Sequence, residues 1–465
     1  MPTPVITVLS AHRHPRLRYV LRLLSDDLGW RFRLVTDPAK AGPGPGLSYG
    51  MESGDPPYPA LPAHPFLAGA SASEEDLTVR WQDDVPFYFA VGNEVAPLLA
   101  DVPAPNQSDL LACIFFTVTR YEEYSSPAAD AHGRFPASAS HARRNGYLHL
   151  PVVRTWTSLI SKLLRDRFPE LPPPHRPPAY LQPTYDIDLL WAYRYRGLRG
   201  VAAGVRDVMT GHPGRALDRL RSTPTSDPYD TLDRLRDLHG PDSTAPGAPP
   251  SHPLPSPRPR FFWLLADNGD RKDPNPYPIP EEQRSRMRAL SEWADHGLHP
   301  GYRSTDDAIT ITAEAARFTD VFGRAPVHSR QHFLRFRLPD TYRDLRQNGL
   351  QHDHSMGYAD AIGWRAGTNL PHPWYDLERE EMTGLTVHPF AAMDVTLKNY
   401  LGLGAEEAIR RVRELFSGLE GYGGPCALLW HNSSFAAEYG WAGWWEAYRV
   451  LWNTPSVGSM GSTLC

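Results

Sequence analysis

The chain has 465 residues and a formal net charge of −5, with 48 lysines and arginines against 53 aspartates and glutamates. This length predicts two or three domains, or one large α/β barrel with a smaller domain. So small a net charge gives no reason to expect nucleic acid or an anionic membrane as a partner.

The cysteine content and the lack of long apolar runs restrict the cellular compartment that we expect for the protein. Cys113, Cys426 and Cys465 are too widely spaced for a zinc motif or a disulfide framework, which favours a reducing compartment. The N-terminal stretch MPTPVITVLSAHRHPRLRYVL lacks the pattern of a signal peptide, and no apolar run is long enough to span a membrane. We therefore expect a cytoplasmic protein without a membrane span; the sequence leaves its oligomeric state open.

Residues 1–170 are predicted to form a smaller α/β domain. PVITVLS is typical of a buried strand, and PRLRYVLRLLSDDLG has the leucine and valine spacing of a helix. DLLACIFFTVTRYEEYSS predicts one apolar helix that begins behind Ser108 and Asp109, and VVRTWTSLISKLLRDRF predicts an amphipathic helix. The proline-rich residues 168–178 then serve as a linker.

Residues 178–465 alternate between strand-like and helical stretches, which predicts parallel strands in a doubly wound sheet or a barrel. A second proline-rich segment, residues 241–260, is interpreted as an insertion within this domain. The strand-like runs are AYLQPTYDID, RFFWLLADNGD, GLHPGYRS, APVHSRQHFLRF, GLQHDHSMGYA, LTVHPFAAMD and PCALLWHNSS. Many end in polar residues, and parallel α/β folds carry their sites at the carboxyl ends of strands.

Asp186 and Asp188 end the first of these runs. Residues i and i+2 of a strand point to the same face, so the two carboxylates repel each other unless a cation or a shared proton lies between them. One could then hold a metal while the other acts as a base. A polar turn with two solvated aspartates is the alternative interpretation.

Later strand ends supply further candidates. His299 in GLHPGYRS could ligate a metal through an imidazole nitrogen, and His431 in LLWHN could protonate a leaving group. The SRQHFLRF run adds His332 as another possible ligand, and arginines there could hold carboxylates in a fixed orientation. We predict substrate-binding roles for Arg330, Asp353, Arg365 and Asn432.

Nucleotide and serine-hydrolase chemistry lack their motifs. No G-x-x-x-x-G-K-[ST] loop is present, no G-x-G-x-x-G follows a strand, and no G-x-S-x-G elbow occurs. The ordered set TYDID, HPGYRS, RFRLP and LLWH instead resembles the NodB-like polysaccharide deacetylases, the carbohydrate esterases of family four. The resemblance covers about residues 178–440 and implies a distorted (β/α) barrel. VTRYEEYSS and DAHGRF resemble an extra domain that precedes the barrel in one bacterial branch of that family.

The resemblance implies roles for individual residues. Asp186 matches the catalytic base and His431 the general acid, while Arg335 matches the arginine that orients the base. Asp188 and His299 match metal ligands, and the resemblance implies a divalent metal, with zinc as the expected ion. The second histidine of the H-x-x-x-H motif is absent, because Arg303 stands four residues after His299; His332 is the candidate replacement.

The implied activity is hydrolysis of an N-acetyl group on an amino sugar or polysaccharide, so a carbohydrate is the expected substrate. The missing histidine motivates an alternative, a catalytically inactive NodB-like domain that binds a glycan or a partner protein. Hydrolysis of other C–N bonds, such as those of cyclic amides, is a third possibility.

Overall fold

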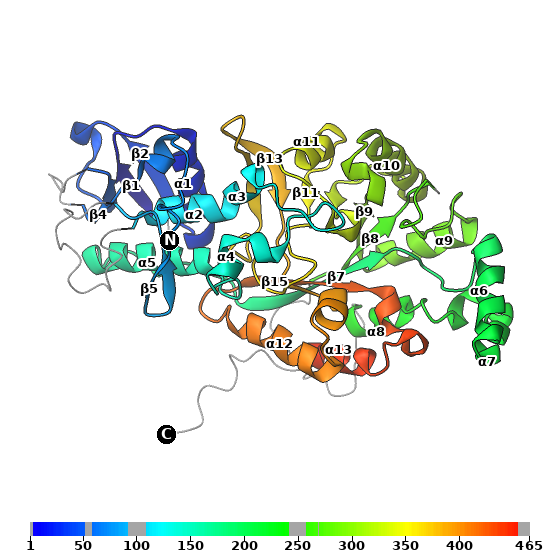
Figure 1. The fold of residues 1–465 in the computed structure, drawn as a ribbon. Coiled ribbons are helices and arrows are strands. Elements are labelled where there is room, and N and C mark those ends of the chain that lie inside the picture. The colour runs from blue at the N-terminus through cyan, green and yellow to red at the C-terminus, as the bar shows by residue number, and fades with distance from the viewer. Residues whose placement is uncertain (1–2, 52–57, 92–107, 241–256, 268, 454–465) are drawn as a thin grey trace, which may run out of the picture.

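The structure is a computed structural model that describes residues 3–51, 58–91, 108–240, 257–267 and 269–453. It is a mixed α/β protein in which a four-stranded sheet and a nine-stranded sheet lie side by side (Figure 1). Most of the predicted insertion at 241–260 lies outside the described residues.

The N-terminal part is built on a parallel sheet with the strand order β2-β1-β3-β4. The predicted strand PVITVLS forms β1, which is central in this sheet, and the predicted first helix forms α1. The strands are β1 (Val5–Leu9), β2 (Arg31–Val35), β3 (Gly46–Tyr49) and β4 (Ala60–Leu61), with a separate hairpin of β5 (Arg80–Gln82) and β6 (Val85–Phe87). The helices are α1 (Pro15–Leu28), α2 (Leu110–Thr119), α3 (Tyr121–Ser125), α4 (His141–Arg144) and α5 (Val152–Arg167).

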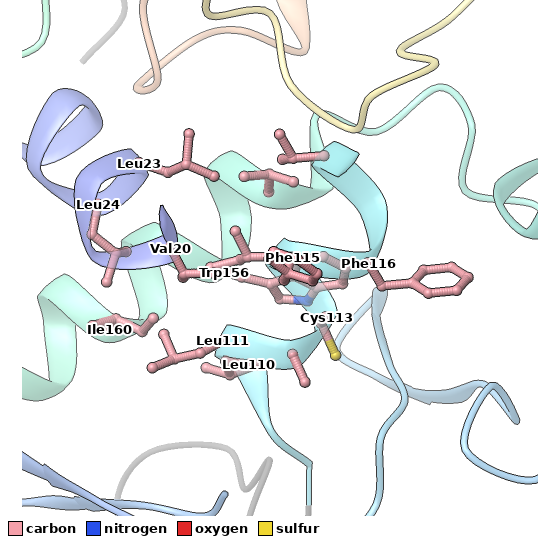
Figure 2. Packing of buried hydrophobic residues seen from close by; sticks show 14 of the residues in the cluster. Val20, Leu23, Leu24, Leu110, Leu111, Cys113, Phe115, Phe116, Trp156 and Ile160 are labelled. Atoms are coloured by element: carbon pink, nitrogen blue, oxygen red, sulfur yellow. The ribbon is translucent and has the colours of Figure 1, made fainter. Parts of the chain in front are cut away.

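Helix α2 is the centre of this part. All ten of its residues are buried, and it packs between α1 and α5 (Figure 2). Asp109 caps it by accepting hydrogen bonds from the backbone N–H groups of Leu111 and Ala112. The predicted single helix is wrong beyond Thr119, because Arg120 takes a left-handed conformation with φ 56° and divides α2 from α3.

The nine-stranded sheet has the order β12-β13-β11-β10-β9-β8-β7-β15-β14. Each of the seven predicted strand-like runs contributes a strand to it. All its neighbouring pairs are parallel except β12 with β13. The strands are β7 (Ala179–Ile187), β8 (Arg260–Leu264), β9 (Asp295–His299), β10 (His328–Ser329), β11 (His352–Asp353), β12 (His372–Asp376), β13 (Glu381–Val387), β14 (Ala392–Met393) and β15 (Gly424–His431).

The sheet is open between its outer strands β12 and β14, so the described strands do not form a closed barrel. The first strand, β7, lies between β8 and β15, which places the ends of early and late strands next to each other. The helices that lie between these strands or after them in the chain are α6 (Gly197–Met209), α7 (Pro213–Arg221), α8 (Leu232–His239), α9 (Glu281–Ala289), α10 (Ile309–Phe322), α11 (Asp340–Gln347), α12 (Ala405–Ser417) and α13 (Trp444–Asn453). No helix in the described ranges is long and apolar enough to cross a bilayer.

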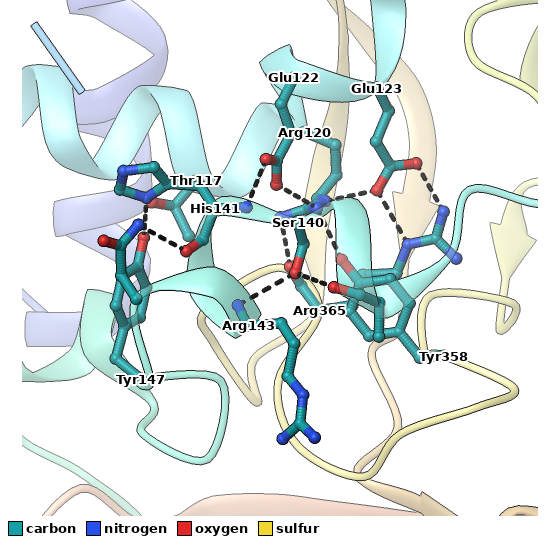
Figure 3. A network of polar contacts seen from close by, with 12 residues as sticks. Thr117, Arg120, Glu122, Glu123, Ser140, His141, Arg143, Tyr147, Tyr358 and Arg365 are labelled. Atoms are coloured by element: carbon teal, nitrogen blue, oxygen red, sulfur yellow. Dashed lines mark hydrogen bonds and ion pairs between the residues drawn. The ribbon is translucent and has the colours of Figure 1, made fainter. Parts of the chain in front are cut away.

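A buried charge network joins the two parts of the chain (Figure 3). Arg365, which follows β11, makes two hydrogen bonds to Glu123 of α3, with Nε–Oε1 at 2.9 Å. Arg120 donates to the same carboxylate and to the hydroxyl of Tyr358. Burial by itself raises the pKa of Glu123, but the charges of Arg365 and Arg120 outweigh it and lower the pKa below its usual value. These contacts make Arg365 a residue of the interface between the parts.

Replacing Arg365 tests that role. Arg365→Met leaves the buried carboxylate of Glu123 with fewer partners, so we expect a loss of about 3–5 kcal/mol in the free energy of unfolding. Urea unfolding measures it. Arg337→Met removes an exposed arginine paired with Asp306 and should change stability little. Equal losses in the two variants would contradict the prediction, as would an Arg365→Met protein of normal stability.

Candidate active site

The two aspartates of the TYDID motif meet at the carboxyl end of β7. Asp186 is buried within the strand, opposite His431 of the neighbouring strand β15, and Asp188 follows the strand end. His299 ends β9, and its Nε2 lies 3.6 Å from Asp186 Oδ2 and 3.3 Å from Asp188 Oδ1. The strand geometry therefore brings both carboxylates to one histidine, as the i, i+2 spacing predicts.

Asp188, His299 and His332 form a group whose ligand atoms all lie within 4.8 Å of one another. Both histidines direct Nε2 towards Asp188, with His332 Nε2 3.6 Å from Asp188 Oδ2. His332 comes from the turn directly after β10, a strand separated from β7 by β9 and β8. His332 thus brings a second imidazole to the group, although no histidine stands four residues after His299.

Each histidine of the group is oriented through its other ring nitrogen. His299 Nδ1 hydrogen-bonds to the backbone carbonyl of Arg330, which can only accept, so Nδ1 carries the proton. His332 Nδ1 lies 2.7 Å from a carboxylate oxygen of Asp273. Asp273 also accepts from the backbone N–H of Tyr302, which fixes the carboxylate in turn. Such partners hold imidazole rings with a free Nε2 ready for a cation.

Electrostatics favour a positive charge beside Asp188. Burial by itself raises the pKa of Asp188, but the charge of His332 and the close polar contacts with His299 and His332 outweigh it and hold the pKa well below its usual value. The pKa of His332 is raised to about 9, because Asp188 and Asp273 more than reverse the lowering effect of burial. In the protein alone, a proton on His332 supplies the charge that Asp188 requires.

The residues present fit a divalent metal. Asp188 Oδ1 is buried and lies 3.3 Å from His299 Nε2, but no hydrogen bond of suitable geometry reaches it from the described residues, although buried carboxylate oxygens normally accept one. One carboxylate and two imidazoles are a ligand set used for zinc and other borderline transition metals. A cation among Asp188, His299 and His332 would satisfy this oxygen.

Asp186 is held by Arg330 rather than by Arg335. Arg330 is fully buried and donates from Nη1 to Asp186 Oδ1 at 2.8 Å and from Nη2 to Thr184 at 2.8 Å. Its guanidinium lies over the ring of Phe262, 4.4 Å from the ring centroid. The arginine therefore fixes the orientation of Asp186 and leaves Oδ2 directed towards His299.

His431 is paired with Asp394, which follows β14. His431 Nδ1 lies 2.8 Å from Asp394 Oδ1, and the backbone N–H of His431 donates to Asp394 Oδ2. Its Nε2 lies 4.0 Å from Asp188 Oδ2. Burial by itself lowers the pKa of His431, but Asp394 and the two site aspartates raise it to about 10. The imidazole is thus held protonated, and its Nε2–H lies on the side of the Asp188, His299 and His332 group.

Four predicted site residues lie outside this group. Arg335 donates to the backbone carbonyls of His132 and Tyr302 and pairs with Asp306, so its predicted contact with the base is not formed. Asn432 is buried and its amide donates to two backbone carbonyls. The side chains of Asp353 and Arg365 are occupied by hydrogen bonds within the protein, and their predicted substrate contacts have no support in the geometry.

Asp273 and Asp394 are functional candidates that were not predicted from the sequence. Asp394 ends the predicted run LTVHPFAAMD, so its place at a strand end was a signal that could have identified it. Asp273 lies in the polar loop after β8, among several other aspartates, and nothing in the local sequence distinguishes it. Its role depends on a contact with His332, which is 59 residues away in the chain.

A loop of the N-terminal part reaches this site. Arg134 donates to the backbone carbonyl of Phe333 at 2.8 Å and is itself held by Asp130. Phe333 and Leu334 directly follow His332, and both have positive φ angles, 61° and 53°. Left-handed conformations cost non-glycine residues about 1–2 kcal/mol each. The contact from Arg134 therefore stabilises a strained segment that positions His332.

Comparisons with known proteins give limited information. Residues 6–169 match a "family of unknown function (DUF7033)". A search of solved structures finds a "putative polysaccharide deacetylase from Mycobacterium smegmatis" at 16% identity and a TM-score of 0.36, covering 60% of this chain and 85% of the other. No curated protein matches. The structural likeness is too low to carry an argument about function, which must come from the site.

Removal of the Arg134 contact tests the link between the N-terminal loop and the site. In Arg134→Ala we expect faster hydrogen exchange at the backbone amides of Leu334 and Arg335, whose bonds to Gln331 and His332 close this turn. Adding Phe333→Gly should slow exchange again, because glycine accepts positive φ without strain. Arg143→Ala, at an exposed arginine, is the control. Unchanged exchange in Arg134→Ala would refute the link.

Proposed function

We propose that this protein is a metal-dependent hydrolase that removes an N-acetyl group from an amino sugar or polysaccharide. The observation that carries the proposal is the group of Asp188, His299 and His332, in which a buried oxygen of Asp188 accepts no hydrogen bond of suitable geometry from the described residues. Asp186 and His431 lie beside that group, each held by a second charged residue. Base, ligands and acid thus come from neighbouring strand ends, as hydrolysis at a single carbonyl requires.

Asp188, His299 and His332 would hold the metal, and zinc fits the donors best. When bound, such a metal supplies Lewis-acid polarisation of a carbonyl and a nucleophile at neutral pH. The protein provides the proton transfers. Asp186 is oriented by Arg330 to accept a proton from the attacking water, and His431 is held protonated by Asp394 to donate one to the departing amine.

Arg303 does not obstruct the metal group. It stands in the chain where the deacetylases have their second histidine, but its side chain is 45% exposed and lies near Asp267 and Asp307. His332 brings the second imidazole from the end of a different strand. In this chain the second imidazole would therefore come from a different strand end than in the deacetylases. The metal would still have two imidazole ligands.

An inactive domain that binds a glycan is the second candidate, motivated by the missing motif histidine. Two observations favour the hydrolase. The ligand set is complete without the motif histidine, and the acid His431 retains a dedicated carboxylate partner in Asp394. Buried charges that serve no reaction are costly to keep. The choice of an acetylated sugar over another amide depends on the resemblance of the four motifs.

We also propose that residues 178–465 adopt the distorted barrel of the NodB-like type in an open form, in which the edge strands β12 and β14 of the described sheet do not pair. The parallel order of its strands, with the last long strand β15 returning beside the first strand β7, supports this arrangement. In this proposal residues 1–170 are the accessory domain, and the protein acts in the cytoplasm.

Two aspartate variants separate metal binding from catalysis. Asp188→Ala removes the carboxylate ligand, and we expect zinc affinity to fall by at least about tenfold. Asp186→Asn keeps the ligands but removes the base, so it should bind zinc like the wild type and lose about 10²-fold or more in kcat. Zinc titration by calorimetry and acetate release from N-acetylated oligosaccharides measure the two effects.

The exposed Asp307→Asn is the matched control and should retain both properties. A wild-type protein that binds no divalent metal, or an Asp186→Asn variant with full acetate release, would contradict the proposed function. Glycan binding by such a protein without acetate release would favour the inactive domain.

The Asp394 and His431 pair gives a further test. Asp394→Asn removes the charge that keeps His431 protonated, so we expect kcat to fall by about 10-fold or more while KM changes little. Metal affinity should stay unchanged, because His431 is not among the proposed ligands. Steady-state kinetics over a range of substrate concentrations distinguishes the two parameters; an unchanged kcat would exclude His431 as the acid.

A further inference from the structure

Helices α6 and α7 form a hairpin at the edge of the molecule far from the N-terminal sheet (Figure 1). The hairpin follows β7 and lies outside the site just described. On α6, five large apolar side chains are exposed to solvent: Leu198, Val201, Val205, Val208 and Met209. Their spacing of three and four residues places them on one face of the helix.

Helix α6 exposes its apolar face to solvent, whereas a normal surface helix buries that face. Among the α6 side chains whose burial the structure describes, Asp207 is the buried one, whereas Leu198 and Met209 are 87% and 81% exposed. A surface helix of a globular protein ordinarily turns its apolar stripe to the core. The apolar face of α6 is therefore exposed to solvent in the described part of the chain, where it can contact another apolar phase.

Helix α7 repeats the arrangement. Leu217 and Leu220 are exposed, Leu220 to 84%. The arginines Arg215 and Arg219 face inward: Arg219 pairs with Asp207 at 2.7 Å, and Arg215 donates to the backbone carbonyl of Glu438. Their guanidinium groups also lie over the rings of Tyr439 and Tyr193. Polar contacts thus fasten the hairpin, and both apolar faces point outward.

The charge of the hairpin is opposite in sign to that of the whole chain. Residues 197–221 contain five arginines and two aspartates, with no lysine or glutamate, in a protein of net charge −5. Arg206 and Arg221 are exposed at the borders of the apolar faces. Arginine beside an exposed apolar stripe is the pattern of helices that lie in the plane of a membrane surface.

We propose that the α6–α7 hairpin docks the protein on an anionic lipid surface. The apolar side chains enter the boundary between headgroups and acyl chains, and the arginines contact lipid phosphates. Charge favours lipid over a second copy of the chain, because two identical hairpins of net positive charge repel each other at a shared interface. This role is independent of the proposed hydrolysis.

Vesicle flotation with the full-length protein tests the proposal. The wild type should float with vesicles of equimolar phosphatidylglycerol and phosphatidylcholine, and far less with phosphatidylcholine alone. Leu198→Ser combined with Met209→Ser should lower the partition coefficient by about tenfold or more, because two buried apolar side chains are lost. Arg206→Glu combined with Arg221→Glu should weaken binding to the anionic vesicles selectively.

Ile309→Ser is the matched control, since Ile309 is 78% exposed on α10 and should leave binding unchanged. The thermal unfolding of each variant verifies that it folds. Failure of the wild type to float, equal binding to both vesicle types, or full binding by the Leu198 and Met209 double variant would each overturn the proposal. So would light scattering that shows a dimer in the wild type and a monomer in that variant.

Discussion

The site depends on holding two carboxylates, Asp186 and Asp188, within reach of one histidine. The strand geometry of β7 directs both side chains to His299, where they would repel each other without compensation. Arg330 supplies the positive charge for Asp186, and the imidazole of His332 supplies it for Asp188. This division of charge gives the two aspartates different environments and hence different proposed tasks.

The same constraint explains why residues far apart in the chain converge on the site. His332 requires Asp273 to fix its ring, and the strained turn after His332 is held by Arg134 from the N-terminal part. The network of Glu123 and Arg365 joins the two parts elsewhere along the same interface. The N-terminal part is therefore connected to the ligand-bearing loop by hydrogen bonds, and it has a structural influence on the site.

Local patterns in the sequence were sufficient for β1, for the seven strand-like runs of the larger sheet and for the cap at Asp109, whereas the grouping of Asp188 with His299 and His332 came from the resemblance of the ordered motifs. The local patterns succeeded because period-two alternation and strand-end polar residues are local signals. Pairing between residues far apart in the chain was not visible in the sequence. The contact of Asp273 with His332 is an example, because Asp273 is one of several acidic residues in its loop. Matching motifs led to Arg335 as the partner of the base, whereas only the packed structure shows that Arg330 reaches Asp186.

The net charge of the chain also concealed a local feature, since the acidic remainder outweighs the arginines of α6 and α7. The site at the strand ends, the α6–α7 hairpin and the interface of Glu123 with Arg365 all depend on which charged side chains are buried and which charges they pair with. The most direct measurement of the central claim is anomalous diffraction from crystals soaked in zinc. The account predicts one strong peak within bonding distance of Asp188, His299 Nε2 and His332 Nε2; a zinc-soaked crystal without a peak there would contradict it.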